Sequence, residues 1–162
     1  MARSRVAVVA LLAAVSLGGF GAGRLTRDLH TEAVVIDVLD GDTIRVARGP
    51  GEEETVRLLG VDTPETHHPE RPVECFGPEA SAHTETRLLG RTVRLETDVE
   101  TRDVYGRLLA YVVVDGRRYN DELLELGFAR LLVILPNGAH AREMLTAELA
   151  ARRAGRGLWG EC

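Results

Sequence analysis

Apolar and polar residues alternate in several short runs of this chain, as they do in strands that have one buried face. Five such runs predict five strands: residues 32–39, 43–48, 54–61, 91–97 and 107–116. In the first run the alternation places Val34, Ile36 and Val38 on one face. Pro50 lies between two glycines after the second run, so the second and third runs should form a hairpin.

Three further segments have the start and stop signals of helices: residues 77–90, 121–127 and 139–155. Gly77 and Pro78 begin the first helix, and Asn120 is a suitable N-cap for the second. In the third helix, apolar residues at helical spacing predict the buried side: Ala141, Met144, Leu145 and Leu149. Five strands interleaved with helices predict a small mixed barrel of the α+β class.

The first residues of the chain have the pattern of an export signal. Arg3 and Arg5 precede a run without charge, residues 6–23, which is typical of a secretory signal or an uncleaved signal anchor. Either one places the folded part outside the cytoplasm, secreted or in the cell envelope, with anchoring in a membrane as one alternative. The domain organisation is then: residues 1–23, signal or anchor; residues 24–31, linker; residues 32–162, folded domain.

Charge and cysteine content narrow the picture further. The formal net charge of the chain is −5 at pH 7. Arg3 and Arg5 are the only charged residues before residue 24, so residues 24–162 have a net charge of −7. This argues against loose, charge-driven binding of nucleic acid but leaves room for a local cationic pocket. Cys75 and Cys162 fit a disulfide in an exported protein, with two free thiols as the alternative.

The stretch "LDGDTIRV" places Asp40 and Asp42 on either side of a glycine. Such a pair is either an Asp-Gly turn or half of a metal site. If the hairpin turn centres near residues 49–51, paired residue numbers sum to about 101, and Asp42 lies opposite residue 59 or 60. Asp62 follows directly, so Asp42 and Asp62 should leave the hairpin at the same end.

More polar side chains belong to this end of the hairpin. Thr63 and Glu65 lie in the loop that Asp62 begins. In a strand with Val56 and Leu58 on one face, Arg57 points the other way, toward the carboxylates.

Four stretches, "VLDGDTIRV", "VRLLGVDTPET", "HPERPVECFGPEAS" and "DVYGRLLAYVVVDG", together resemble the staphylococcal (thermonuclease-like) nuclease family. The resemblance runs from about residue 34 to Trp159 and implies a five-stranded OB-type β-barrel with three helices. It also implies a monomeric, calcium-dependent enzyme that hydrolyses DNA and RNA with low sequence specificity, favours single strands and leaves 3′-phosphate products.

The resemblance assigns the metal ligands to matching positions. Asp42 and Asp62 match the ligands of Ca²⁺, together with the backbone carbonyl of Thr63, and Asp40 matches a carboxylate close to the ion. A site with so few protein ligands should bind Ca²⁺ weakly.

The catalytic residues carry over in the same way. Arg57 and Arg107 match two phosphate-binding arginines, and Glu65 matches the proposed general base, although it could equally hold only a hydrogen-bond network. Tyr105 and Tyr111 match tyrosines around the bound nucleotide, with a place in the core as the alternative for Tyr111.

Two positions depart from the pattern of the family. Val104 stands where the best-known member of the family has a lysine, and Val113 where it has a tyrosine, and both changes should weaken nucleotide binding.

Two other functions remain open. One alternative is a non-catalytic OB module of the cell envelope that binds nucleic acid or protein. The other is a structural domain that calcium stabilises. The presence of every charged residue of the catalytic set argues against lost catalysis.

Overall fold

The computed structural model describes residues 30–66 and 72–162. The predicted signal or anchor, residues 1–23, lies outside the described residues, as does most of the predicted linker. The first strand begins at His30. None of the described helices has both the length and the apolar character needed to cross a bilayer.

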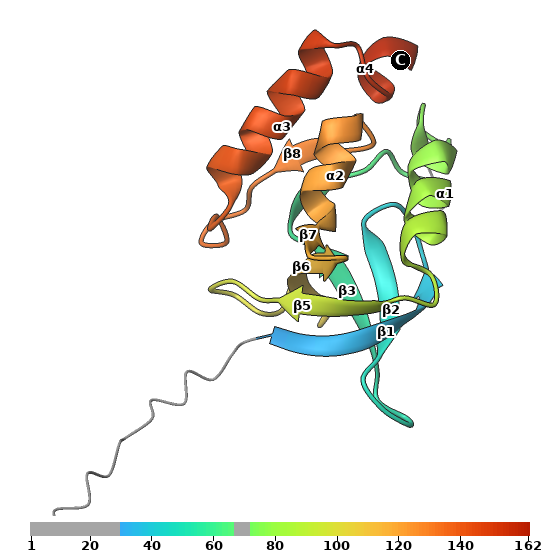
Figure 1. Cartoon of the computed structure of the whole chain (residues 1–162), viewed down its shortest axis with the longest axis vertical. Helices are drawn as coiled ribbons and strands as arrows, with labels where there is room; N and C mark the ends of the chain where they lie inside the picture. Colours follow the sequence, from blue (N-terminus) through green and yellow to red (C-terminus); the bar gives the residue numbers. More distant parts are fainter. Residues whose placement is uncertain (1–29, 67–71) are drawn as a thin grey trace, which may run out of the picture.

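Five strands form a closed barrel, as the alternation predicts (Figure 1). They are β1 (His30–Val38), β2 (Thr43–Ala47), β3 (Glu53–Leu58), β5 (Thr92–Glu96) and β6 (Leu108–Val114). Neighbours in the order β3-β2-β1-β5-β6 are antiparallel, and parallel pairing of β3 with β6 closes the barrel. The closed five-stranded barrel, together with the helices described below, confirms the predicted architecture and is consistent with an OB-type fold.

The third predicted strand divides into two elements at a glycine. Gly60 has φ +74°, a conformation that residues with a Cβ rarely adopt, and the chain turns there between β3 and β4 (Gly60–Asp62). β4 leaves the barrel and pairs with β8 (Arg130–Leu132), a strand that the sequence pattern does not predict. This turn carries Asp62 away from the barrel wall. A short strand, β7 (Arg117–Arg118), pairs with the end of β6.

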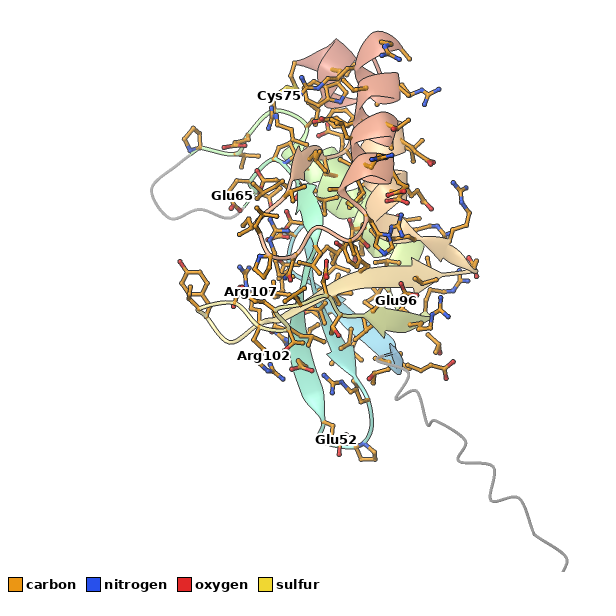
Figure 2. All side chains as sticks on the ribbon, turned by 90° about the vertical axis from the view of Figure 1, so that its left-hand side faces the viewer. Glu52, Glu65, Cys75, Glu96, Arg102 and Arg107 are labelled. Carbon is orange, nitrogen blue, oxygen red and sulfur yellow. A yellow bond between two sulfur atoms is a disulfide. The ribbon has the colours of Figure 1, made fainter. Side chains whose placement is uncertain are left out.

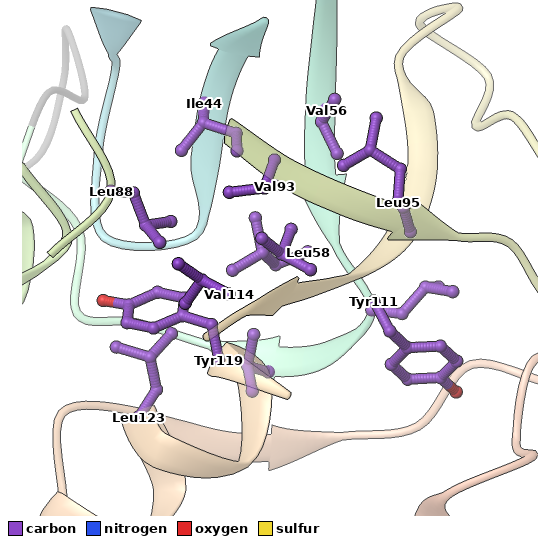
Figure 3. Close-up of a cluster of buried hydrophobic side chains, with 14 of the residues drawn as sticks. Ile44, Val56, Leu58, Leu88, Val93, Leu95, Tyr111, Val114, Tyr119 and Leu123 are labelled. Atoms are coloured by element: carbon purple, nitrogen blue, oxygen red, sulfur yellow. The ribbon is translucent and has the colours of Figure 1, made fainter. Parts of the chain in front are cut away.

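The three predicted helices are present. They are α1 (Gly77–Leu88), α2 (Tyr119–Leu126) and α3 (Ala141–Arg153), and a single turn, α4 (Leu158–Glu161), follows them. Figure 1 shows α2 between α1 and α3, above the end of the barrel. Side chains from the barrel interior and from these helices form one core (Figure 3). Its largest fully buried members include Ile44, Leu58, Leu88, Leu95, Tyr119 and Leu123.

The face of β1 that points into the core is the opposite of the one that carries the predicted apolar set. Ala33 and Val35 are buried, whereas Val34 is 40% and Ile36 39% exposed. Residues 33–36 are all apolar, so alternation alone does not select a face. The pairing of β1 with β2 shifts by one residue between Val35 and Asp37, which marks a β-bulge at this point.

The predicted buried side of α3 is also partly wrong. Met144 is buried, but Leu145 is 44% and Leu149 38% exposed. The buried side instead contains Glu148, whose carboxylate accepts the N–H of Leu131 at 3.1 Å. A charged residue is placed inward because it has this partner in β8, which the helical pattern does not reveal.

Asn120 is not the N-cap of α2, because the helix begins at Tyr119, two residues before the predicted start. The Asn120 side chain is fully buried, where it accepts the N–H of Val112 and donates to the carbonyl of Leu59, both at 2.8 Å. The amide group therefore connects α2 to β6 and to the turn before β4.

A disulfide joins Cys75 to Cys162, with 6.0 Å between the two Cα atoms. It connects the last residue of the chain to the segment just before α1. This segment also contacts Glu65, because Glu74 donates its N–H to the Glu65 carbonyl at 2.9 Å.

Candidate functional site

The loop between β1 and β2 presents two carboxylates and packs tightly against another loop. Asp40 Oδ1 accepts the N–H of Asp42 at 2.9 Å, so the Asp-Gly turn is present. A Cβ added to Gly41 would lie only 2.7–2.8 Å from side-chain atoms of Thr63. Glycine therefore permits this loop to approach the segment after β4 directly, and the turn does not exclude a role in metal binding.

The hairpin register brings Asp42 and Asp62 together, one residue away from the predicted alignment. Thr43 pairs with Arg57, and the carbonyl of Asp42 accepts the N–H of Leu58 at 2.8 Å. Asp42 Oδ2 accepts the N–H of Thr63 at 2.9 Å. The buried carboxylate of Asp42 therefore lies against the residue that follows Asp62.

Arg57 lies between the two carboxylates. Its Nη2 is 3.1 Å from Asp42 Oδ2 and 3.2 Å from Asp62 Oδ1. Its Nη1 donates to the carbonyls of Leu58 and Val61, each at 2.8 Å. Arg57 is thus fixed by backbone acceptors on one side and faces the acidic pair on the other, as the strand alternation predicts.

Burial makes the negative charge of Asp42 costly. Burial, and after it the nearby Asp40 carboxylate, raise the pKa of Asp42 to about 7, although the charge of Arg57 opposes them. A cation bound beside Asp42 would offset this cost and favour the ionised carboxylate.

Closure of the barrel brings Arg107 near Arg57 and the two carboxylates. In the parallel pairing of β3 with β6, Arg57 is the partner of Leu109, and Arg107 lies two residues earlier. Arg107 Nε donates to Asp103 Oδ2 at 2.6 Å, and the Arg107 N–H donates to Asp103 Oδ1 at 2.9 Å. Burial raises the pKa of Asp103, but the hydrogen bonds and charge of Arg107 outweigh it, so this pKa is lowered. The sequence pattern did not single out Asp103.

One cavity of about 210 Å³ collects the candidate residues. Its walls include all of the predicted acidic and basic groups, together with Thr63: Asp40, Asp42, Arg57, Asp62, Glu65 and Arg107. Figure 2 shows Glu65 and Arg107 on the same face of the molecule. Glu65 accepts the N–H of Thr66 at its Oε1, and its own N–H donates to Glu74 Oε2 at 3.3 Å.

A larger cavity of about 450 Å³ adjoins the first, and both are lined by Arg57 and Arg107. Its other walls are largely aliphatic, with Leu132 and Ile134 among them. Tyr105 is 82% exposed at this cavity, and the Arg107 guanidinium carbon is 5.5 Å from the centre of its ring. An extended anion with a flat apolar group could span the two cavities.

Tyr111 does not line either cavity. Its side chain is 2% exposed, and its hydroxyl donates to Asp98 Oδ2 at 3.2 Å. Figure 3 shows it at one side of the core. This is the core position that the sequence analysis kept as the alternative for Tyr111, in a stretch of β6 in which Ala110, Tyr111 and Val112 are all buried.

The candidate ligands of the metal ion are oxygen atoms. Among residues 30–66 and 72–162, no three His, Cys, Asp or Glu side chains are grouped to bind one metal ion. The Asp42 and Asp62 carboxylates and the Thr63 carbonyl supply oxygen donors only, which Ca²⁺ prefers, with water completing its coordination. The buried charge of Asp42 is the feature that such an ion would compensate.

Comparisons with known proteins identify relatives along most of the chain. The family model described as "Staphylococcal nuclease homologue" matches residues 55–161. Thermonuclease from Staphylococcus hyicus is 37% identical over 142 residues, covering 88% of this chain and 83% of the relative. Thermonuclease from Staphylococcus intermedius is 36% identical, and the match covers 95% of this chain and 92% of the relative. Endonuclease YncB from Bacillus subtilis is 38% identical, and the match covers 76% of this chain and 59% of the relative. The match to the family model, and the identity of 36–37% to two thermonucleases over most of both chains, show that the chain belongs to the staphylococcal nuclease family.

Proposed function

We propose that this chain is a calcium-dependent nuclease that hydrolyses phosphodiester bonds of DNA and RNA and leaves 3′-phosphate products. The observation that carries the proposal is the single cavity in which Asp42, Asp62, Arg57, Glu65 and Arg107 meet. Relatives described as thermonucleases and an endonuclease support the same reaction class.

Asp42, Asp62 and the backbone carbonyl of Thr63 would hold the calcium ion, with Asp40 beside it. When bound, the ion would supply positive charge to a phosphate oxygen and to the attacking water. The two arginines contribute the rest of the positive charge. An arginine presents several N–H donors in one plane and stays charged at any working pH, which suits a phosphate in its transition state.

Glu65 is the candidate proton acceptor for the attacking water. Its carboxylate lines the same cavity as the two arginines, within reach of a phosphate bound between them. In this scheme Arg57 and Arg107 hold the phosphate, and Glu65 orients and deprotonates the water.

The larger cavity would hold a base of the substrate. Tyr105 offers an exposed ring for stacking, which does not read sequence. Leu132 and Ile134 offer apolar contact without base-specific hydrogen bonds. Low sequence specificity and a preference for unstacked single strands follow from such walls.

We further propose that the protein acts outside the cytoplasm as a monomer, either free or anchored in a membrane. The charged start and apolar run of residues 1–23 support export. A calcium site with two carboxylates should bind with a dissociation constant of about 10⁻⁴–10⁻³ M, which suits extracellular calcium.

The test is digestion of 5′-labelled single-stranded DNA by the full chain in calcium, in EGTA, and by Asp62→Asn in calcium. We expect cleavage by the wild type in calcium alone and fragments that a polymerase extends only after phosphatase treatment. Full cleavage in EGTA would rule out the calcium mechanism. Tight binding of the DNA without cleavage in any condition would favour the non-catalytic module instead.

A further inference from the structure

A buried pair of hydroxyl groups connects α1 and α2 to the loop that carries Asp40 and Asp42. Thr84 in α1 is fully buried, and its Oγ1 is 2.8 Å from the carbonyl oxygen of Gly41. Tyr119, at the start of α2, is also fully buried, and its hydroxyl is 2.9 Å from Thr84 Oγ1. Figure 3 shows the Tyr119 ring among the buried side chains of the core.

The direction of these hydrogen bonds follows from the acceptors. The Gly41 carbonyl can only accept, so Thr84 donates its proton there, and Tyr119 must then donate to the Thr84 oxygen. The carbonyl of Ala80, one turn earlier in α1, is 3.1 Å from Thr84 Oγ1 and competes for the same proton. Because Tyr119 occupies a lone pair of the Thr84 oxygen, it orients that hydroxyl toward the carbonyls.

Gly41 is a sensitive point of the candidate metal site. It lies between Asp40 and Asp42, and its other side packs on Thr63 so closely that a Cβ would not fit. A shift of the Gly41 carbonyl would therefore move the Asp42 carboxylate relative to the Thr63 carbonyl, the two groups proposed to bind one ion. Such positioning groups behind metal ligands typically change metal affinity by about 10- to 100-fold when they are removed.

We propose that Thr84, oriented by Tyr119, is a positioning residue for the metal site and fixes the Asp40–Asp42 loop against Thr63. The inference rests on the proposed calcium-dependent function and deepens it. Neither residue touches the cavity that holds the candidate ligands. Their effect should therefore appear in calcium affinity and not in the chemical step.

The experiment measures calcium binding by titration calorimetry and kcat at saturating calcium, on the full chain. Thr84→Val keeps the side-chain shape and removes the hydroxyl, and Thr84→Ser keeps the hydroxyl. We expect Thr84→Val to raise the calcium dissociation constant about tenfold, by analogy with other supporting groups, with little change in kcat. Thr84→Ser should bind calcium like the wild type.

A control separates positioning from loss of stability. Val93→Ala truncates a buried side chain in β5 that lines none of the cavities described above, so it should lower the unfolding midpoint without changing calcium affinity. A Thr84→Val protein that unfolds earlier but binds calcium like the wild type would overturn the inference, since its hydroxyl would then be only structural.

Two further outcomes are decisive. If Thr84→Val does not fold, Tyr119→Phe takes its place, with calcium binding expected to weaken by a smaller factor, and unchanged binding overturns the inference. If the wild type neither binds calcium nor cleaves DNA, the proposed function fails and the inference falls with it. Normal binding and cleavage by the wild type, with no change in the variants, overturns the inference alone.

Discussion

The two arginines of the candidate site differ in what holds them. Arg57 is engaged at both terminal nitrogens, by two backbone carbonyls and by two carboxylates. Arg107 is held at Nε by Asp103, and within the described part of the chain its terminal nitrogens form no hydrogen bond or ion pair. In the proposed mechanism, Arg107 is therefore the arginine whose terminal nitrogens can bind a phosphate without first releasing a partner.

Replacement of Arg107 should affect catalysis strongly. We expect Arg107→Ala to lower kcat on single-stranded DNA by at least about 100-fold, the usual effect of removing one preorganised donor from a transition state. Arg117→Ala is the matched control, because Arg117 pairs with Glu125 on the surface and lines neither cavity. Equal rates for Arg107→Ala and the control would remove Arg107 from the mechanism.

At the scale of elements, the sequence predicts where strands and helices form better than which way they face. Alternation and turn residues locate the barrel strands and the three main helices to within a few residues. They do not select the face of β1, where residues 33–36 are all apolar, or that of α3, where Glu148 is buried because β8 offers it a partner. Which face of a strand or helix is buried depends on neighbouring elements that are distant in sequence.

For the candidate site, the sequence predicts which residues come together better than it predicts the contacts that support them. The hairpin register brings Asp42 near Asp62 because Asp42 immediately precedes β2 and Asp62 follows β3 at the same end of the hairpin, and a one-residue error does not separate them. The resemblance alone does not decide between a nucleotide contact and a place in the core for Tyr111, because three successive residues of β6, Ala110, Tyr111 and Val112, are buried. The contact between Thr84 and Gly41 spans 43 residues, and no local pattern indicates it.

The observed face of α3 can be tested directly. Met144→Ala removes a buried side chain and should lower the free energy of unfolding by about 2–5 kcal/mol, whereas Leu145→Ala, one residue further on the exposed side, should cost less than about 0.5 kcal/mol. Urea unfolding followed by circular dichroism measures both. A larger cost for Leu145→Ala would show that α3 is rotated relative to this structure.

The disulfide should stabilise the fold through the long loop that it closes. Cys75 and Cys162 are 87 residues apart, and loop entropy gives an upper value of roughly 4–5 kcal/mol for such a bond. We expect Cys162→Ser, and the wild type in a strong reductant, to unfold at the same lower denaturant concentration. Unchanged stability on reduction would show that the bond contributes nothing to the folded state.

At the scale of the whole molecule, closure of the barrel assembles the site. Asp42 precedes β2 and Asp62 follows β3, at the same end of their hairpin. Arg107 precedes β6 and lies near Arg57 because β3 pairs with β6. The helices then fix the β1–β2 loop from behind, through Thr84 and Tyr119. Although the chain is acidic overall, Arg57 and Arg107 give the two adjoining cavities a local positive charge, which the proposed binding of phosphate requires.

The central claim is that Asp42 and Asp62 bind one divalent ion together. Calcium titration of the wild type, Asp42→Asn, Asp62→Asn and the double variant tests it most directly, with circular dichroism to verify folding. We expect one ion per wild-type chain, a loss of at least about tenfold in affinity for each single variant, and a double variant that loses less than the sum of the two single free-energy losses. Full additivity of those losses, or calcium binding that neither substitution changes, would contradict the account.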